Sequence, residues 1–77
     1  MFEMEESELK QKVDFYQKQK TIVHIETFNG RFYNGIILDS SDKHLVLNDR
    51  KIGELFLNFS EISLLEKNKW LGVENNE

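Results

Sequence analysis

The sequence predicts a mainly β domain in which one N-terminal helix precedes five short, strongly bent antiparallel strands that form a barrel. Apolar residues first recur at helical spacing and then, from about residue 20, at every second position. Clusters of Asn, Asp, Ser and Gly separate the later apolar runs, and no proline interrupts a strand. Five short strands at regular spacing are typical of a small barrel.

The expected helix covers residues 4–18. Leu9, Val13 and Tyr16 fall at positions i, i+4 and i+7, which places them in one narrow apolar stripe among charged residues. Acidic residues lie in the first turns and Lys18 lies near the end, which suits the helix dipole. A stripe this narrow is enough for a helix that lies across one end of a barrel.

The first two strands are expected at residues 21–28 and 31–39, joined at Asn29-Gly30. Asn-Gly between two strand patterns is the strongest short-range signal for a hairpin, and a type I′ turn has positive φ at both of its central residues. Gly35, in the second strand, has no side chain to obstruct a sharp bend.

The other strands are expected at residues 44–48, 54–59 and 62–66, after a polar turn at residues 39–42. We therefore expect one domain over residues 1–66, with the barrel over about 20–66, and a polar C-terminal tail over 67–77. Two placements are open for Trp70 in that tail: against its own barrel or against a neighbouring copy.

A chain of 77 residues is near the lower limit at which a hydrophobic core alone holds a fold together. The sequence has no cysteine, which excludes disulfides and thiolate zinc sites. His24 and His44 are far apart in sequence and do not make a metal site on their own. Self-association is the support that remains, and we expect no metal, cofactor or small-molecule substrate.

The formal net charge is −4, but most of it lies outside the strands. Residues 20–65 hold five basic and six acidic residues, a charge of −1. Such a barrel lacks the broad basic surface of many DNA-binding domains, so contact with nucleic acid must depend on local geometry and stacking. No apolar run approaches the roughly 20 residues of a membrane span, and we expect a soluble cytoplasmic protein without a membrane partner.

Two segments resemble the signatures of the Sm and Sm-like (LSm) family. The first is Val23-x-Ile25-x-Thr27-x-Asn29-Gly30-Arg31-x-Tyr33-x-Gly35-x-Ile37, followed after a polar turn by Leu45-Val46-Leu47. The second is Leu55-Phe56-Leu57-Asn58-Phe59-Ser60-Glu61-Ile62. With the leading helix, the resemblance covers roughly residues 9–66.

The resemblance implies a bent five-stranded barrel whose fourth strand pairs with the fifth strand of a neighbouring copy. Such pairing satisfies the backbone groups at a sheet edge, and its head-to-tail repetition can close a ring. Rings of the family commonly hold six or seven subunits and bind single-stranded RNA at the pore, as in RNA chaperoning or RNA processing. The expected ring-interface residues are Leu55, Phe56, Leu57, Phe59, Ile62 and Leu64.

The expected RNA-binding residues are Lys43, His44 and Asn58. His44 occupies the position of the family's base-binding asparagine, and the family's orienting aspartate corresponds to Asp39 or Ser40. Asn58-Phe59 stands where the family has Arg-Gly. An imidazole can stack on a base, and a lysine can contact a phosphate. The alternatives are an exposed turn histidine, an ordinary surface lysine and an asparagine that satisfies backbone groups at a turn.

The aromatic residues of the strands have two possible uses. Strand alternation turns some of Phe32, Phe56 and Phe59 away from the core, where a ring interface would use them; the alternative is a place in the core. Phe28 and Tyr33 are expected in the core or at the barrel rim.

Two other functions are open. A ring that kept the fold but lost the RNA pocket would serve as a scaffold for protein interactions, and an unrelated SH3-like barrel would work as a monomer. Asp39 and Asp42 are not read as a catalytic pair, because no nucleophile or base accompanies them and aspartate is common in turns. We therefore expect no enzymatic activity.

Overall fold

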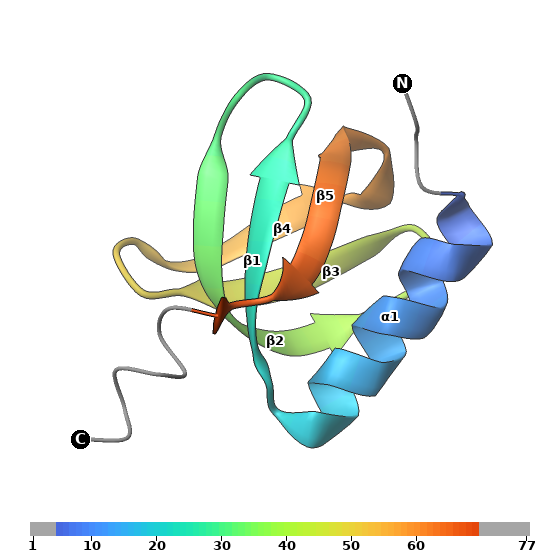
Figure 1. Ribbon diagram of the computed structural model, residues 1–77, viewed down its shortest axis with the longest axis horizontal. Helices are drawn as coiled ribbons and strands as arrows, with labels where there is room; N and C mark the ends of the chain where they lie inside the picture. The colour runs from blue at the N-terminus through green and yellow to red at the C-terminus, as the bar shows by residue number, and fades with distance from the viewer. Residues whose placement is uncertain (1–4, 70–77) are drawn as a thin grey trace.

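The computed structural model describes residues 5–69, which form one α-helix and a five-stranded antiparallel sheet bent into an open barrel (Figure 1). The elements are α1 Glu6–Gln19, β1 Ile22–Thr27, β2 Phe32–Ser40, β3 His44–Asp49, β4 Gly53–Asn58, the 3₁₀ turn η1 Phe59–Glu61 and β5 Ile62–Lys67. The predicted fold class is confirmed. Trp70 lies outside the described residues.

Helix α1 lies outside the sheet and contacts β2, η1 and β5 (Figure 1). Leu9 and Val13 are fully buried in the core, and Tyr16 packs against it from a partly buried position. The helix ends at Gln19, and the left-handed φ of 56° at Lys20 lets the Lys20 N–H donate to the Gln17 carbonyl. The expected apolar stripe is thus the face by which α1 adds to the barrel core.

The sheet bends along β2, because the two halves of this strand pair with different neighbours. The first part of β2 pairs with β1 and its second part pairs with β3, and Gly35 takes part in both pairings. A Cβ atom at Gly35 would lie 1.9 Å from the Asn48 carbonyl oxygen. The expectation of a bend at Gly35 is confirmed, since any side chain there would collide with β3.

The turn between β1 and β2 is not the expected type I′ turn. Of its residues Gly30 alone has positive φ, at 89°, and the Gly30 N–H donates to the Thr27 carbonyl at 3.0 Å. The Thr27 N–H donates to the Arg31 carbonyl, and the Thr27 hydroxyl accepts from the Arg31 N–H. These bonds make a three-residue loop closed by a left-handed glycine, so Asn29 needs no positive φ.

The hydrophobic core fills the inside of the barrel. The strand order is β4-β3-β2-β1-β5, so β4 and β5 are the two edges of the sheet. The buried apolar residues come from α1, η1 and all five strands: Leu9, Val13, Val23, Ile25, Ile37, Leu45, Leu47, Leu57, Phe59, Ile62 and Leu65.

A polar network covers the outer side of β1. His24 is 8% exposed, and its Nδ1 lies 2.8 Å from Asn34 Oδ1 while its Nε2 lies 3.0 Å from Glu26 Oε2. Because both partners are oxygen acceptors, the geometry favours a ring protonated on both nitrogens. Burial lowers the pKa of His24, but the bonds to Glu26 and Asn34 and the charges of Glu26 and Glu66 outweigh it and raise this pKa above its usual value.

The same network anchors the end of the barrel. The Asn68 side chain donates to Asn34 Oδ1 at 2.6 Å, and the Asn68 N–H donates to the Ile22 carbonyl at 2.9 Å. β5 also reaches Lys67, one residue beyond the expected end of the fifth strand. The pairing of β5 with β1 therefore continues past residue 66, the expected end of the domain.

Candidate nucleic-acid interface

Two of the three expected RNA-binding residues lie side by side. His44 begins β3 and Asn58 ends β4, and the two residues are direct partners in the antiparallel register. The pairing continues one step further, because the Phe59 N–H donates to the Lys43 carbonyl at 2.8 Å. Residues 14 to 16 positions apart in sequence thus form one patch at the end of the β3–β4 hairpin.

Phe56 completes this patch. The imidazole of His44 stacks on the Phe56 ring, with centroids 4.2 Å apart and planes inclined by 22°. Phe56 lies diagonally across the strand pair from His44, a distance that aromatic side chains can span. Its ring remains exposed, and Phe56 had been assigned to the ring interface from the sequence. We call His44, Phe56 and Asn58 the β3–β4 patch.

Ser41 orients the His44 ring. The Ser41 hydroxyl and His44 Nδ1 are hydrogen-bonded at 2.8 Å, and the Ser41 N–H donates to the His44 carbonyl at 2.9 Å. Asp39 and Ser40 are instead bonded elsewhere: Asp39 Oδ1 accepts from the Ser40 N–H, and the Ser40 hydroxyl donates to Gln17. The expectation that Asp39 or Ser40 orients His44 is therefore wrong. The register of β2 with β3 shifts between Ile37 and Asp39, just before this turn.

Carboxylates stand next to the other two expected residues. The Lys43 side chain is 78% exposed, and its ammonium lies 3.9 Å from Glu6 Oε1 at the start of α1. The Asn58 amide donates to Glu61 Oε2 at 3.2 Å. Lys43 therefore has the freedom to reach a phosphate, but its local field is partly cancelled.

The backbone of β4 offers three residues to a further strand. Since the Phe59 N–H bonds to Lys43, alternation assigns Leu57 and Leu55 to β3 and turns the N–H and C=O groups of Asn58, Phe56 and Glu54 outward. These three residues form the free edge of β4.

The same reasoning defines the free edge of β5. Asn68 bonds to Ile22, so Glu66 and Leu64 bond to β1, whereas Lys67 and Leu65 turn their N–H and C=O groups away from it. The register with β1 shifts at Ser63, where this alternation ends. Each barrel therefore presents one unpaired edge on β4 and one on β5.

The expected ring-interface residues differ in how deeply they are buried in their own barrel. Leu57, Phe59 and Ile62 are buried in the core of their own barrel, and Leu55 packs against that core. Phe56 is exposed, and Leu64 is partly exposed. Phe59 is buried on the same side as Leu55 and Leu57, because it continues the alternation of β4. Among the other aromatics, Phe28 and Phe32 are exposed and Tyr33 packs against the core.

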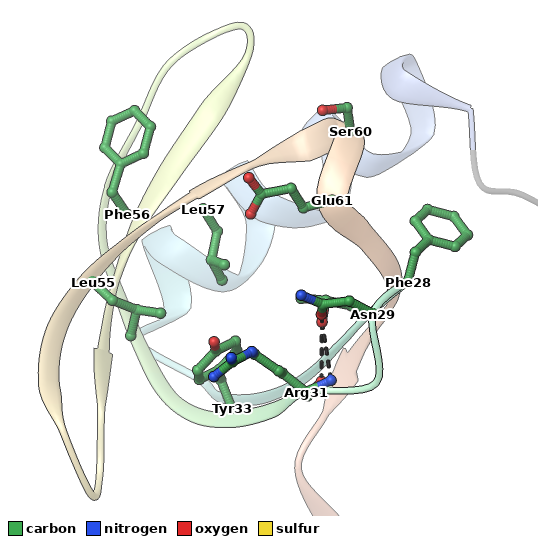
Figure 2. A pocket seen from close by; sticks show the side chains of 10 residues that line it. Phe28, Asn29, Arg31, Tyr33, Leu55, Phe56, Leu57, Ser60 and Glu61 are labelled. Atoms are coloured by element: carbon green, nitrogen blue, oxygen red, sulfur yellow. Dashed lines mark hydrogen bonds between the residues drawn. The ribbon is translucent and has the colours of Figure 1, made fainter.

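A cavity of about 460 Å³ lies where the sheet is open, between β4, η1 and the β1–β2 hairpin. Figure 2 shows Leu57 and Tyr33 pointing inward, whereas the Phe56 and Phe28 rings point away from the cavity on opposite sides. Arg31 supplies a cation and Glu61 a carboxylate to its lining. No sequence pattern predicts this hollow, because its walls come from segments far apart in the chain.

Residues 5–69 contain no group of three or more histidine, aspartate or glutamate side chains placed to hold a metal ion. No helix within that range is long and apolar enough to cross a membrane.

A helix followed by five antiparallel strands in a bent sheet, with β4 and β5 at its edges, defines the Sm-like fold. A crystal structure of the pleiotropic translational regulator Hfq has this fold: it superposes with a TM-score of 0.67 at 18% sequence identity, covering 74% of this chain and 93% of the Hfq chain. No protein-family model matches the sequence, and no curated protein matches it.

Proposed function

We propose that this chain is a divergent Sm-like protein that binds single-stranded RNA with the β3–β4 patch and Lys43, and that it has no catalytic activity. The observation that carries the proposal is the arrangement of His44: its ring is fixed by Ser41, stacked on exposed Phe56 and paired with Asn58. The structural similarity to a translational regulator agrees with an RNA partner.

The chemistry of the patch fits a splayed nucleotide. Bases of single strands stack on aromatic and imidazole rings, and stacking tolerates any base. Among the described residues no partner bonds His44 Nε2, so it is available to a base edge. The Asn58 amide can bond a base if it exchanges Glu61 for the ligand. Lys43 supplies the contact to a phosphate.

We further propose that copies assemble by pairing β4 of one subunit with β5 of the next. Free residues on each edge support this pairing: Glu54, Phe56 and Asn58 on β4, and Leu65 and Lys67 on β5. Repetition of the contact closes a ring, for which six or seven subunits are expected from the family resemblance. Phe56 and Leu64 are then the exposed or partly exposed apolar side chains nearest the interface.

A second candidate function is a protein scaffold with the same ring but without RNA binding. The carboxylates of Glu6 and Glu61 beside Lys43 and Asn58 favour this alternative, since both oppose phosphate. The two candidates are separated by a pull-down from a lysate with nuclease treatment. Protein partners that stay bound after the nuclease favour the scaffold.

Two measurements test the proposal. Sedimentation must give a mass well above the 9.2 kDa of one chain, because a 9.2 kDa particle would make this a monomeric barrel. Short oligo-U and oligo-A RNA at moderate salt should bind the wild type and bind His44→Ala more weakly. Absence of binding to either RNA would reject the RNA-binding proposal and leave the scaffold.

A further inference from the structure

The free edge of β5 is already contacted by a side chain of its own subunit. The Lys12 ammonium donates to the Leu65 carbonyl oxygen at 3.0 Å, across 53 positions of sequence. Leu65 is one of the two residues of that edge, together with Lys67. The acceptor is therefore one of the groups that a neighbouring β4 would use.

The position of α1 makes this contact possible. Leu9 and Val13 anchor the helix in the core, and the helix packs against β5. Lys12 precedes Val13 by one residue, so its side chain leaves the helix beside the buried stripe and is itself partly buried. Among the described residues no carboxylate pairs with Lys12, whereas Lys10 on the same helix pairs with Asp14 at 3.0 Å.

We propose that Lys12 guards the β5 edge, so that a second copy of this chain must displace its ammonium before β4 can pair there. The inference rests on the proposed β4–β5 assembly and adds its regulation. Lys12 then sets the protein concentration above which subunits associate.

Two physical arguments support the guard. Lysine is a common protection of exposed strand edges, because a strand that docks there would have to desolvate its charge. A paired strand would lie about 4.8 Å from β5, and its N–H would compete with the ammonium for the Leu65 oxygen. A hydrogen bond given by a charged group is stronger than a neutral one, so the competition costs the incoming strand free energy.

Covalent modification of the Lys12 ammonium would remove this protection of the β5 edge. Acetylation removes the charge of a lysine and leaves a neutral amide in its place. A modified Lys12 would hold the Leu65 carbonyl more weakly, and assembly would begin at lower concentration.

The test compares Lys12→Met with Lys10→Met, which removes the same charge from the same helix but not from the edge. Sedimentation velocity over a dilution series gives the concentration at which half of the chains are assembled. Lys12→Met should lower it by about three- to tenfold, the effect expected of one such hydrogen bond. Lys10→Met should leave it near the wild-type value, and so should Lys12→Arg, which still donates.

If Lys12→Met and Lys10→Met assemble at the same concentration, the proposed role of Lys12 is rejected. Assembly of the wild type would still support the ring in that case. If wild type and all variants stay monomeric at every concentration, both the assembly and the guard are rejected. Far-UV circular dichroism of each variant checks that α1 is intact, so that a shift cannot come from loss of the helix.

Discussion

The His44 imidazole stacks on the Phe56 ring with centroids 4.2 Å apart, and these two residues come from different strands. The pair forms a flat surface whose outer member is 57% exposed. Because Ser41 fixes the imidazole, the surface is ordered before any ligand arrives. A nucleobase would extend an existing stack, which places Phe56 beside His44 in the proposed RNA contact.

Phe56→Ala should weaken binding of single-stranded RNA by about tenfold, since one base stacked on an aromatic side chain is worth about 1–3 kcal/mol. Fluorescence anisotropy with labelled oligo-U and oligo-A measures the effect. Phe15→Ala is the matched control, because Phe15 is also 57% exposed but lies on α1. Equal affinities for the two variants would remove Phe56 from the site.

Phe56→Pro should prevent assembly while the barrel still folds. The Phe56 N–H faces the free edge of β4, where proline is tolerated because no bond within the subunit is lost. The substitution does remove one donor for the neighbouring subunit. Sedimentation of Phe56→Pro against Phe56→Ala isolates that donor, since both lack the ring. A Phe56→Pro protein that assembles as Phe56→Ala does would argue against pairing through this edge.

His24 should make the free energy of unfolding depend on pH. Its pKa is raised in the folded state, so the protonated ring stabilises the fold fully below its unfolded pKa of about 6.5. That contribution is lost as pH rises through the higher folded pKa. The urea midpoint should therefore fall as the pH rises above about 6.5.

His24→Gln should flatten this dependence, because the amide does not titrate. His44→Gln should keep it, since His44 lies outside the network of Glu26, Asn34 and Asn68. A midpoint that falls equally in both variants would assign the pH dependence to another group.

Gly35→Ala should destabilise the barrel far more than Gly30→Ala. A Cβ at Gly35 meets the Asn48 carbonyl at 1.9 Å, so the backbone of β3 has to shift, at a cost of about 3 kcal/mol or more. A Cβ at Gly30 meets nothing within 4 Å and costs only the strain of its φ of 89°, about 1–2 kcal/mol. Urea unfolding compares the two variants, and equal losses would contradict the close approach of β2 and β3.

Several local features of the structure could be predicted from the sequence because they depend on neighbouring residues. The spacing of Leu9 and Val13 gave the buried face of α1, and Gly35 marked the bend in β2. Lys43, His44 and Asn58 were named together from the family resemblance, and the structure brings them to one end of the β3–β4 hairpin. The type I′ turn was wrong because the loop has three residues, of which Gly30 alone has positive φ.

The sequence by itself thus determined the order of the elements, the core faces and the neighbourhood of the site, since periodicity and turn chemistry are local properties. The tertiary structure alone decided the contacts that depend on register and docking. The turn between β2 and β3 placed the Ser41 hydroxyl on the His44 ring, and the pairing of β3 with β4 brought Phe56 against that ring. The packing of α1 put Lys12 on the Leu65 carbonyl. Such contacts join positions whose separation in sequence carries no signal, because hydrogen bonds and stacking act only over a few ångströms in space.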